Sequence, residues 1–352
     1  MAERLRIVCL DIAASKTGAL SVLRDFYSDI REFDSFNEWF FITGSPDILT
    51  EDPKTPNIHV VVREDVKRSK VRRLLFDRFT GRSFLKSLKP DIVFSMQNTL
   101  PRGLEGLRDS NGNKIRTVIY LHQPLGFQKE KRFSFFNKWE REAALYQYLI
   151  GAVIDSSLKR ADKIIVQTKW MKEAVLKKDR IDGDRVDIIP PHMPDLSKLC
   201  KPGIKRDPAY FFYPAGSIIY KDHQCIIDAA AIIWKRKYRN FRIIFTEKEQ
   251  DLPWLKVPAE IRDCLDFRGR VERSEMVPLY QRSVLLFPSY IETFGYPLAE
   301  ARSLGAPVIA ADTAFSRELL NGYDKCRFFK VSSSVELSRL MEESIKGGWG
   351  DS

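Results

Sequence analysis

Residues 284–312 read VLLFPSYIETFGYPLAEARSLGAPVIAAD and contain one complete strand–helix–strand unit. The unbroken apolar run at the start is typical of a strand that is buried on both faces of a parallel sheet. Pro297 suits the first turn of a helix, because its missing N–H would have no partner there. Gly305 is a typical residue just beyond a helix, and the apolar run after it predicts the next strand. The stretch therefore predicts an α/β fold.

Glu292 and Glu300 flank the loop of this unit. We expect Glu292 at the strand exit or in the loop, and Glu300 in the first turn of the helix. The helix start between them exposes backbone N–H groups that can hold a phosphate, and Gly295 allows close approach to the backbone. Glu300 would then accept hydrogen bonds from ribose hydroxyls, and Glu292 would meet a bound sugar. On the spacing alone, a solvated loop acid and an acid that favours the helix dipole explain the pair as well.

The same alternation of short apolar runs and longer amphipathic runs continues outward along the chain. It indicates βα units with parallel sheets covered on both faces. A Pro-rich stretch interrupts it near residues 190–208. We predict two Rossmann-like domains whose parallel sheets face each other across a cleft, with ligands at the carboxyl ends of the strands. The predicted parts are an N-terminal domain over 1–195, a linker over 196–208, a C-terminal domain over 209–335 and a C-terminal helix or tail over 336–352. The strands predicted before the linker are 5–11, 39–43, 58–62, 91–96, 117–122 and 163–168.

Composition limits the classes of function. The chain has 352 residues with 44% hydrophobic and 30% charged residues, which is typical of a globular protein of two domains. Its formal charge of +11 favours an anionic partner such as a phosphorylated small molecule or a membrane surface, and no nucleic-acid-binding motif accompanies it. Five scattered cysteines predict a reduced chain, and the apolar run before Asp11 is too short for a signal peptide. We therefore expect a cytoplasmic protein without a nucleic-acid partner.

The stretch 284–319 resembles the C-terminal signature of the retaining glycosyltransferases of family four, which have the GT-B fold. The family pattern is PS-x-x-E-x-FG-x-P-x-x-E-A, an E-x7-E motif, followed by G-x-PV-x-A and a later RE pair. The resemblance is strong over about 210–320 and looser before that. The matching residues are Pro288, Ser289, Glu292, Phe294, Gly295, Pro297, Glu300, Ala301, Gly305, Pro307, Val308, Ala310, Arg317 and Glu318.

This resemblance implies a donor site for a nucleotide-diphospho-sugar. It implies that Glu292 lies against the donor sugar and acts in catalysis, and that Glu300 binds the nucleotide ribose. It also implies a metal-independent reaction with retention at the anomeric carbon, no cofactor and no metal site. The four histidines lack the spacing of metal ligands. The loop residues that would contact the donor are Thr293, Phe294, Gly295 and Tyr296.

Residues 211–230 resemble the donor-phosphate segment of the family, in which a lysine at a helix start neutralises the diphosphate. Lys221 matches that lysine, so the resemblance implies that it acts in both catalysis and donor binding. Many members carry an arginine five residues earlier, where this chain has Gly216. Either another cation replaces that arginine, or fewer charges hold the phosphate.

Residues 267–283 resemble the strand, turn and helix that enclose the base in this family. Main-chain groups of Arg270 and Val271 would then contact the base, which leaves the identity of the base open. Arg268 or Arg270 could compensate for the charge missing at Gly216.

The first half of the chain carries two further site residues by resemblance. Gly18 stands where the family has a Gly-rich loop after the first strand, and it would face the donor phosphate or the acceptor. His122 ends a predicted strand at a point where the family has a histidine near the donor sugar. A histidine titrates near pH 6.5 and could orient a hydroxyl or share a proton in catalysis, whereas a bare histidine at a strand end is often structural.

The resemblance implies a retaining hexosyltransferase that moves a sugar from a nucleotide-diphospho-sugar to a saccharide or lipid-linked saccharide acceptor, in surface polysaccharide or glycan biosynthesis. Positioning and electrostatics would carry such a reaction without a dedicated nucleophile. The alternatives are a nucleotide-sugar epimerase or phosphorylase on the same fold and a non-catalytic nucleotide-sugar-binding protein.

A basic stretch, Lys67–Lys89, contains nine basic residues and one acid. Its apolar residues fall at helical spacing, so it predicts a basic amphipathic helix. Such a helix suits either an anionic membrane surface, which would place the protein peripherally at the inner face, or ordinary packing on the sheet with a solvated basic face. Aromatic residues near further cations, at 129–139, would be a second contact or an acceptor loop.

Overall fold

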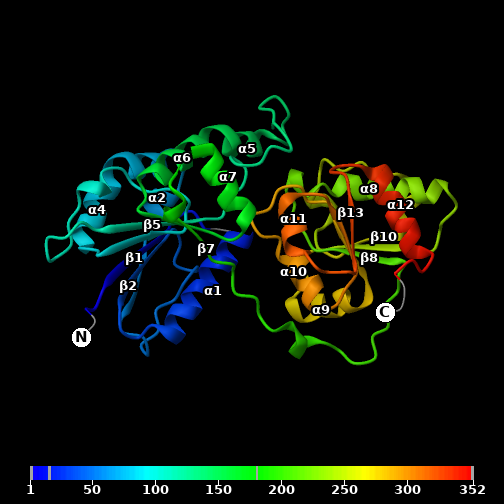
Figure 1. Ribbon diagram of the computed structural model, residues 1–352, viewed down its shortest axis with the longest axis horizontal. Coiled ribbons are helices and arrows are strands. Elements are labelled where there is room, and N and C mark those ends of the chain that lie inside the picture. Colours follow the sequence, from blue (N-terminus) through cyan, green and yellow to red (C-terminus); the bar gives the residue numbers. More distant parts are fainter. Residues whose placement is uncertain (1–2, 15–16, 180, 350–352) are drawn as a thin grey trace. The chain divides into compact units, whose positions relative to one another are not determined.

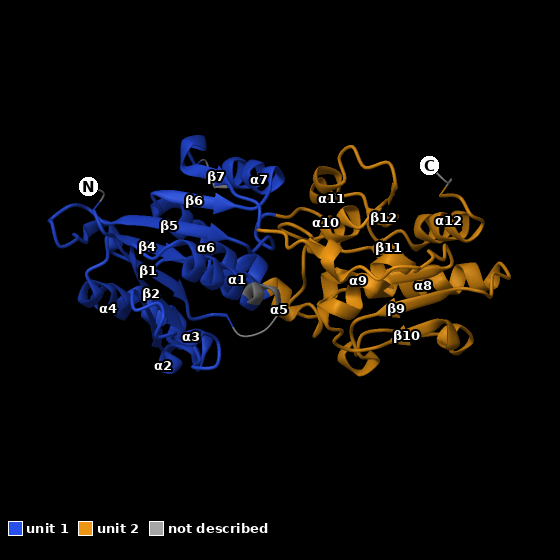
Figure 2. Cartoon of the chain, turned by 90° about the horizontal axis from the view of Figure 1, so that it is seen from below, with its two compact units in different colours: residues 1–127, 145–191 blue, residues 128–144, 192–352 orange. Residues whose placement is uncertain are grey.

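The computed structural model describes residues 3–14, 17–179 and 181–349. Contacts between residues divide the chain into two compact units, which Figure 2 shows in different colours. The first unit holds residues 1–127 and 145–191, and the second holds residues 128–144 and 192–352. Each unit is built on its own parallel β-sheet, which confirms the predicted fold class.

Seven strands within the described residues form the sheet of the first unit, in the order β3-β2-β1-β4-β5-β6-β7. All neighbouring strands are parallel. The apolar runs predict the first six strands. The short β7 escapes prediction because only its first residue is buried. The strands are β1 (Arg6–Asp11), β2 (Glu38–Thr43), β3 (Ile58–Val62), β4 (Ile92–Ser95), β5 (Arg116–Leu121), β6 (Lys163–Val166) and β7 (Val186–Ile188).

Helices cover both faces of this sheet (Figure 1). α1 (Thr17–Phe33) packs on one face, where Leu23 joins Cys9 and Phe41 in an apolar cluster. Val8 and Leu10 point to the other face and join a second cluster. Burial on both faces explains why β1 is a continuous apolar run. The remaining helices of the unit are α2 (Glu64–Lys67), α3 (Lys70–Leu75), π-helical η1 (Phe76–Thr80), α4 (Gly81–Leu88), 3-10 turn η2 (Leu104–Gly106), π-helical η3 (Leu145–Ile150), α6 (Gly151–Arg160), α7 (Lys169–Asp179) and 3-10 turn η4 (Gly183–Arg185).

The described part of the second unit contains a six-stranded parallel sheet in the order β10-β9-β8-β11-β12-β13. The strands are β8 (Tyr210–Tyr213), β9 (Arg242–Phe245), β10 (Leu265–Phe267), β11 (Val284–Phe287), β12 (Val308–Ala311) and β13 (Cys326–Phe329). The helices are α5 (Arg141–Ala144), α8 (His223–Lys235), α9 (Arg273–Arg282), α10 (Tyr296–Ser303), α11 (Ala314–Leu319) and α12 (Ser334–Ile345), with 3-10 turns η5 (Leu196–Leu199), η6 (Ile219–Lys221), η7 (Glu249–Asp251) and η8 (Ala259–Cys264). α12, which accounts for most of the predicted C-terminal helix, packs against α8.

Both sheets reverse their strand order beside their first strand. β1 lies between β2 and β4, and β8 lies between β9 and β11. Open parallel sheets bind ligands at the carboxyl ends of strands beside such a reversal. Asp11 ends β1, while Lys221 and Glu292 come after β8 and β11. Each unit therefore presents polar residues at the edge where this class of sheet binds ligands.

The helix predicted over Lys67–Lys89 forms over residues 70–88, where α3, π-helical η1 and α4 follow one another without a break. It begins later than predicted, because α2 ends before Ser69, whose side chain caps the start of α3. Phe76 and Leu85 are buried in the core of the first unit, so part of the stretch packs as an ordinary domain helix. Other apolar side chains point to solvent. The exposed ones are Val71 (63%), Leu74 (50%), Leu75 (49%) and Phe79 (63%).

Residues 128–144 belong to the second unit, although they lie within the stretch 1–195 predicted as the N-terminal domain. Trp139 of this segment packs against Trp254, with ring centroids 6.0 Å apart. The chain therefore passes between the units after Phe127, again after Ala144 and finally after Pro191.

The five cysteines are all unpaired, and Cys9, Cys225 and Cys264 are buried. Within the described ranges, every helix is too short or too polar to cross a bilayer.

Candidate functional site

Lys221 and Glu292 form an ion pair in the second unit, although 71 positions separate them in the chain. Lys221 ends η6 just before α8, and Glu292 lies in the loop after β11. The hydroxyl of Ser289 donates to the same carboxylate oxygen, Oε1, at 2.8 Å. The two charged side chains are 18% and 16% exposed, so solvent reaches both. The fold thus brings together two of the three residues predicted to act in catalysis.

Residues 293–295 lead into α10, whose first residue is Tyr296. Glu300, expected in the first turn, is the fifth residue of the helix and lies beyond that turn. Gly295 is the N-cap residue, and its φ of +90° lies in the left-handed region that favours glycine. The buried ring of Phe294 packs edge-on against Tyr296, with centroids 5.3 Å apart. Pro297 stands in the first helical turn, where its missing N–H leaves no donor unpaired, and the Leu298 N–H donates to the Gly295 carbonyl at 3.0 Å. The positive end of the helix dipole favours an anion at this start.

Glu300 is only 7% exposed, and both of its carboxylate oxygens have partners. The Tyr280 hydroxyl donates to Oε2 at 2.7 Å, and Nη2 of Arg273 lies 3.2 Å from Oε1. Burial, reinforced by Glu300, raises the pKa of Tyr280 well above its usual value, so its phenol remains a donor. The Arg273 side chain is half exposed (50%). Of the two partners of Glu300, Arg273 is therefore the one that solvent reaches.

Gly216 lies at the end of the segment after β8, where the family pattern has a cation. The nearest side-chain atom to a Cβ built at Gly216 is Oε1 of Glu247, at 3.6 Å. Burial, reinforced by Asp251, raises the pKa of Glu247. The surroundings of this position are therefore acidic, and the cation is not restored there.

The predicted base-contacting residues lie at the start of α9. The Arg270 side chain is 92% exposed and lies 3.9 Å from Glu272, whereas Val271 is half-buried. Arg268 donates to Asp266 at 2.9 Å, so its charge is already paired. Their contact with a base remains a prediction.

His122 follows β5 in the first unit and is held by Asn98. The backbone N–H of His122 donates to Oδ1 of Asn98 at 2.8 Å, which leaves Nδ2 of the amide facing Nε2 of the ring at 3.4 Å. Because Nδ2 can only donate, Nε2 accepts and the ring proton lies on Nδ1. Burial lowers the pKa of His122 to about 4, with a smaller opposing effect of the Tyr120 carbonyl. The imidazole is therefore neutral at physiological pH.

Asn98 itself has a φ of +66°, in the left-handed region that asparagine tolerates better than most residues. Such strained positions often occur at functional sites. Sequence reasoning missed this residue, because an asparagine after a strand is an ordinary loop residue.

Asp11 is a second residue that sequence reasoning missed. It ends β1, is 2% exposed, and accepts the Ala14 N–H at 3.1 Å through Oδ1. Its Oδ2 has no hydrogen-bond partner among the described residues. Burial raises the pKa of Asp11 to about 7, against opposing effects of Ala14, Lys67 and Arg73. The sequence feature that could have pointed to Asp11 is its place as a single acid at the end of an otherwise apolar run. Gly18, predicted for donor binding, lies in the first turn of α1.

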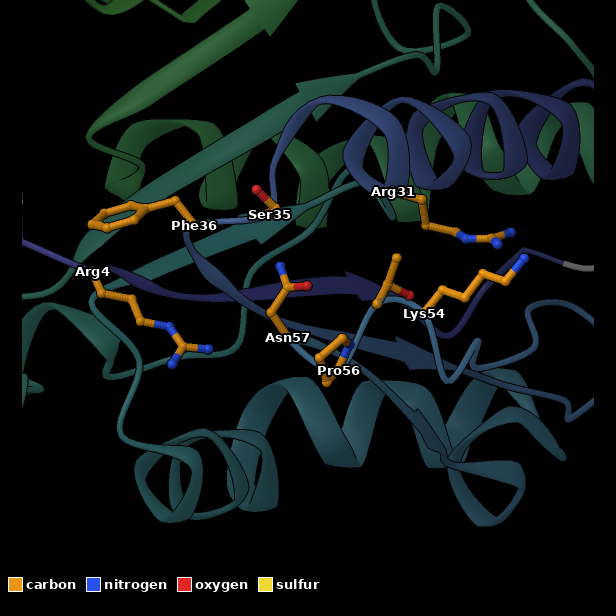
Figure 3. Close-up of a pocket in the computed structure, with 8 residues that line it drawn as sticks. Arg4, Arg31, Ser35, Phe36, Lys54, Pro56 and Asn57 are labelled. Atoms are coloured by element: carbon orange, nitrogen blue, oxygen red, sulfur yellow. The ribbon is translucent and has the colours of Figure 1, made fainter.

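A pocket of about 700 Å³ lies at the amino ends of strands of the first sheet, opposite to the end that carries Asp11 (Figure 3). Arg4 precedes β1, Phe36 precedes β2 and Asn57 precedes β3, so the pocket sits where the strands begin. Its lining includes none of the predicted site residues. The lining residues are Arg4, Arg31, Ser35, Phe36, Lys54, Thr55, Pro56 and Asn57.

The described residues include no cluster of three or more His, Cys, Asp or Glu side chains placed to share a metal ion. The acids of the second unit instead hold protein cations and hydroxyls, as Glu292 and Glu300 do. A metal-independent reaction stays a prediction.

Two family models match the chain. The model described as Glycosyltransferase Family 4 matches residues 38–193, and the model described as Glycosyl transferases group 1 matches residues 198–348. The first match covers most of the first unit's sheet, and the second covers the sheet and helices that carry Lys221 and Glu292.

A curated relative is the O-antigen chain mannosyltransferase RfbU of Salmonella typhimurium, 25% identical over 171 residues. That match spans 48% of this chain and 47% of the relative, about half of each. Two solved structures share the fold. One is Anabaena HepE in complex with UDP and glucose, with a TM-score of 0.65 and 16% identity over 98% of this chain and 91% of that chain. The other is WaaG, a glycosyltransferase involved in lipopolysaccharide biosynthesis, with a TM-score of 0.63 and 16% identity over 98% and 93%.

Proposed function

Since the chain belongs to the group 1 glycosyltransferases, we propose that it transfers a sugar from a nucleotide-diphospho-sugar to a saccharide or lipid-linked saccharide acceptor. The observation that carries this proposal is the Lys221–Glu292 pair, held by Ser289 beside the start of α10. A cation and a helix start suit a diphosphate, and the carboxylate suits the positive charge that develops on the sugar.

The relatives support the class of product. RfbU is named as a mannosyltransferase of the O-antigen chain, and WaaG acts in lipopolysaccharide biosynthesis. The HepE structure contains UDP and glucose, which are parts of a nucleotide sugar. These names favour surface polysaccharide biosynthesis as the setting and a nucleotide sugar as the donor of this chain.

Binding of the donor would rearrange the ion pair. The diphosphate carries more negative charge than one carboxylate, so it would draw the Lys221 ammonium away from Glu292. Ser289 would continue to hold Oε1 of Glu292 at 2.8 Å, which keeps the carboxylate near the sugar. The cation and the acid would then act on opposite charges of the same donor.

We infer a reaction with retention and without a metal. The bond between the anomeric carbon and the diphosphate oxygen breaks, and the acceptor oxygen attacks the same face of the sugar. The acceptor hydroxyl gives its proton to the departing diphosphate, so no protein nucleophile takes part. Lys221 and the positive end of the α10 dipole would stabilise the leaving group, and Glu292 the oxocarbenium-like sugar. Glu300 would hold the ribose after replacing Arg273.

The first unit would supply the acceptor side. His122, neutral and held by Asn98, would border the acceptor side without carrying charge. Gly18 would allow a ligand to approach the start of α1. A nucleotide-sugar epimerase uses the same donor site, and a product analysis separates it from transfer.

The exposed apolar residues of α3 and η1 favour an anionic membrane surface as a further partner. Leu74 and Phe79 are 50% and 63% exposed, and the basic residues of the stretch surround them. This combination is typical of elements that lie in a bilayer interface. It would place the enzyme peripherally at the inner, cytoplasmic face. Co-sedimentation with vesicles that does not respond to anionic lipid would exclude this partner.

The decisive experiment measures release of nucleoside diphosphate from a panel of nucleotide sugars, with saccharide and lipid-linked acceptors. We expect turnover with one donor, and a loss of about 100-fold in Lys221→Met and Glu292→Gln, since each removes a charge that acts mainly in the transition state. NMR of the product should show the anomeric configuration of the donor.

Lys235→Met and Glu260→Gln are matched controls on exposed surfaces of the second unit, and both should retain activity. Absence of turnover and of nucleotide binding across the whole panel would refute the proposed function. Binding of a nucleotide sugar without turnover would favour the non-catalytic alternative.

A further inference from the structure

Residues 131–141, here called the Phe135–Phe136 turn, present two aromatic rings to solvent at the surface of the second unit. Phe136 is 96% exposed and Phe135 is 44% exposed. Isolated exposed apolar residues are common on protein surfaces, but adjacent large ones indicate a contact surface. The turn belongs to residues 128–144, which Figure 2 colours with the second unit.

A buried acid fixes the backbone of the turn from inside. Glu140 is 8% exposed, and its two oxygens hold the Lys131 ammonium at 2.7 Å and the Ser134 N–H at 3.0 Å. Gln128 brackets Lys131 from the other side, accepting its N–H at 3.0 Å and donating to its carbonyl at 2.6 Å. The base of the turn is therefore rigid.

The tip is held as well. The guanidinium of Arg141 donates to the carbonyl of Phe135 at 3.0 Å, and the N–H of Phe136 donates to the hydroxyl of Ser134 at 3.1 Å. Trp139 anchors the turn against Trp254. Because these bonds already fix the backbone, a partner would meet two exposed rings whose backbone needs little further ordering.

The charges around the rings are mostly positive. Arg132, Lys138 and Arg141 are exposed, and Lys138 lies 4.3 Å from the centre of the Trp139 ring. The acid inside the turn, Glu140, already pairs with Lys131. Two phenyl rings bordered by cations complement a partner that has an anionic outer layer over an apolar interior.

We propose that the Phe135–Phe136 turn inserts its two rings into the interface of an anionic bilayer, while Arg132 and Lys138 contact lipid phosphates. A bilayer interface offers both apolar depth and negative charge. The proposal deepens the proposed function, on which it rests for its membrane setting, and it gives the second unit a lipid contact separate from α3 and η1.

The test is binding of the whole chain to vesicles of phosphatidylcholine, with and without phosphatidylglycerol. We expect binding that requires the anionic lipid, and about tenfold or greater loss in the double variant Phe135→Ser/Phe136→Ser. Phe33→Ser, on α1 of the first unit, removes another exposed ring (76%) and should bind like the unchanged protein. Circular dichroism confirms that each variant is folded.

A second measurement reports insertion directly. The indole introduced by Phe136→Trp should be quenched by lipids brominated on their acyl chains, beyond the quenching of the unchanged protein. The proposal is overturned if the double variant binds vesicles normally, or if brominated lipids add no quenching.

The same variants separate this proposal from the proposed function. A double variant that keeps vesicle binding but loses turnover on a soluble saccharide acceptor would make the turn an acceptor contact instead. If no donor supports turnover but the vesicle results hold, the lipid contact stands and the proposed function fails.

Discussion

At the scale of single residues, Lys221 and Glu292 neutralise each other. Their side chains are 18% and 16% exposed, so the pair is partly desolvated. Either charge, left without its partner, would therefore destabilise the folded protein. Glu300 differs, because a buried tyrosine and a half-exposed arginine hold it. The two glutamates of one motif therefore have different partners: Lys221 and Ser289 for Glu292, and Tyr280 and Arg273 for Glu300.

Gly216→Arg should restore the cation that the family pattern places five residues before Lys221. The backbone of Gly216 lies outside the left-handed region, and a Cβ there meets only Oε1 of Glu247 at 3.6 Å, so the side chain fits. One added charge near a diphosphate should tighten binding of the nucleoside diphosphate about threefold to tenfold at low salt, and less at high salt. Isothermal titration calorimetry measures the change.

Gly216→Gln is the matched control, since it has similar reach without charge. Equal affinity of the two variants would mean that the diphosphate does not approach this position, or that Glu247 captures the arginine.

Asn98→Asp should change the protonation of His122. The carboxylate would face Nε2 of the ring in place of an amide NH₂ group and would favour a proton there. The pKa of His122, now lowered to about 4 by burial, should therefore rise, as an NMR titration of the ring would show. Aspartate also tolerates the left-handed backbone at this position.

In Asn98→Ala, the ring loses its partner without gaining a charge, and its pKa should stay low. An unchanged pKa in Asn98→Asp would show that Asn98 does not control the tautomer.

At the scale of elements, the start of α10 depends on Gly295. Gly295→Ala should destabilise the second unit by about 1–2 kcal/mol, because its φ of +90° disfavours any residue with a Cβ. The added Cβ would also lie 3.4 Å from Leu298 and crowd the helix start that is proposed to hold phosphate. We expect a lower melting temperature together with weaker nucleoside diphosphate binding.

Gly305→Ala, at the other end of the same helix, separates the two effects. It has similar strain, with φ +64°, but its Cβ would meet nothing within 4 Å. It should lower stability and leave binding unchanged. Parallel losses of binding in both variants would argue against a phosphate at this helix start.

The sequence predicts most elements correctly, since buried parallel strands and helix boundary residues carry local signals. Pro297 and Gly305 mark α10 to within two residues. The exceptions lack such signals. β7 exposes two of its three residues, and the break at Ser69 depends on a side-chain cap within a stretch that otherwise reads as one helix.

At the scale of the whole molecule, two buried ionisable groups, His223 and Asp11, respond to acid in opposite directions. Burial lowers the pKa of His223, in the second unit, to about 3, with a smaller effect of Lys221. Between about pH 6.5 and 3 the unfolded chain holds a proton that the folded unit does not, so stability falls as pH falls. Asp11, in the first unit, has a pKa raised to about 7. Between pH 7 and about 4, Asp11 holds a proton in the folded protein that it has lost in the unfolded chain. Its contribution to the free energy of unfolding therefore increases as pH falls.

Two variants isolate these contributions. The free energy of unfolding of His223→Leu, relative to the unchanged protein, should be about 2 kcal/mol higher at pH 5 than at pH 7, because burial of an ionisable ring no longer opposes folding. Asp11→Asn should show the reverse, with about 2 kcal/mol more gain at pH 7 than at pH 5. Thermal unfolding at both pH values measures the differences. Variants that shift equally at the two pH values would show that neither group titrates with folding.

The candidate site was only partly predictable at this scale. Glu292 and Lys221 carry the family pattern, and the fold pairs them across 71 positions. Asp11 and Asn98 carry no pattern, since their importance comes from burial and from a hydrogen bond to a distant strand end. The assignment of residues 128–144 to the second unit depends on contacts such as Trp139 with Trp254, which no local signal reports.

The path of the chain also sets an order of events during synthesis. Residues 128–144 leave the ribosome before any other part of their own unit, and Trp254 follows on the order of ten seconds later at ordinary rates. Meanwhile residues 145–191 become available to complete the first unit, so the segment must wait outside it as a loop. During that interval Phe133, buried in the finished protein, lacks its partners. A nascent chain of this design exposes residues 128–144 in mid-translation, and it is there that a ribosome-associated chaperone would bind.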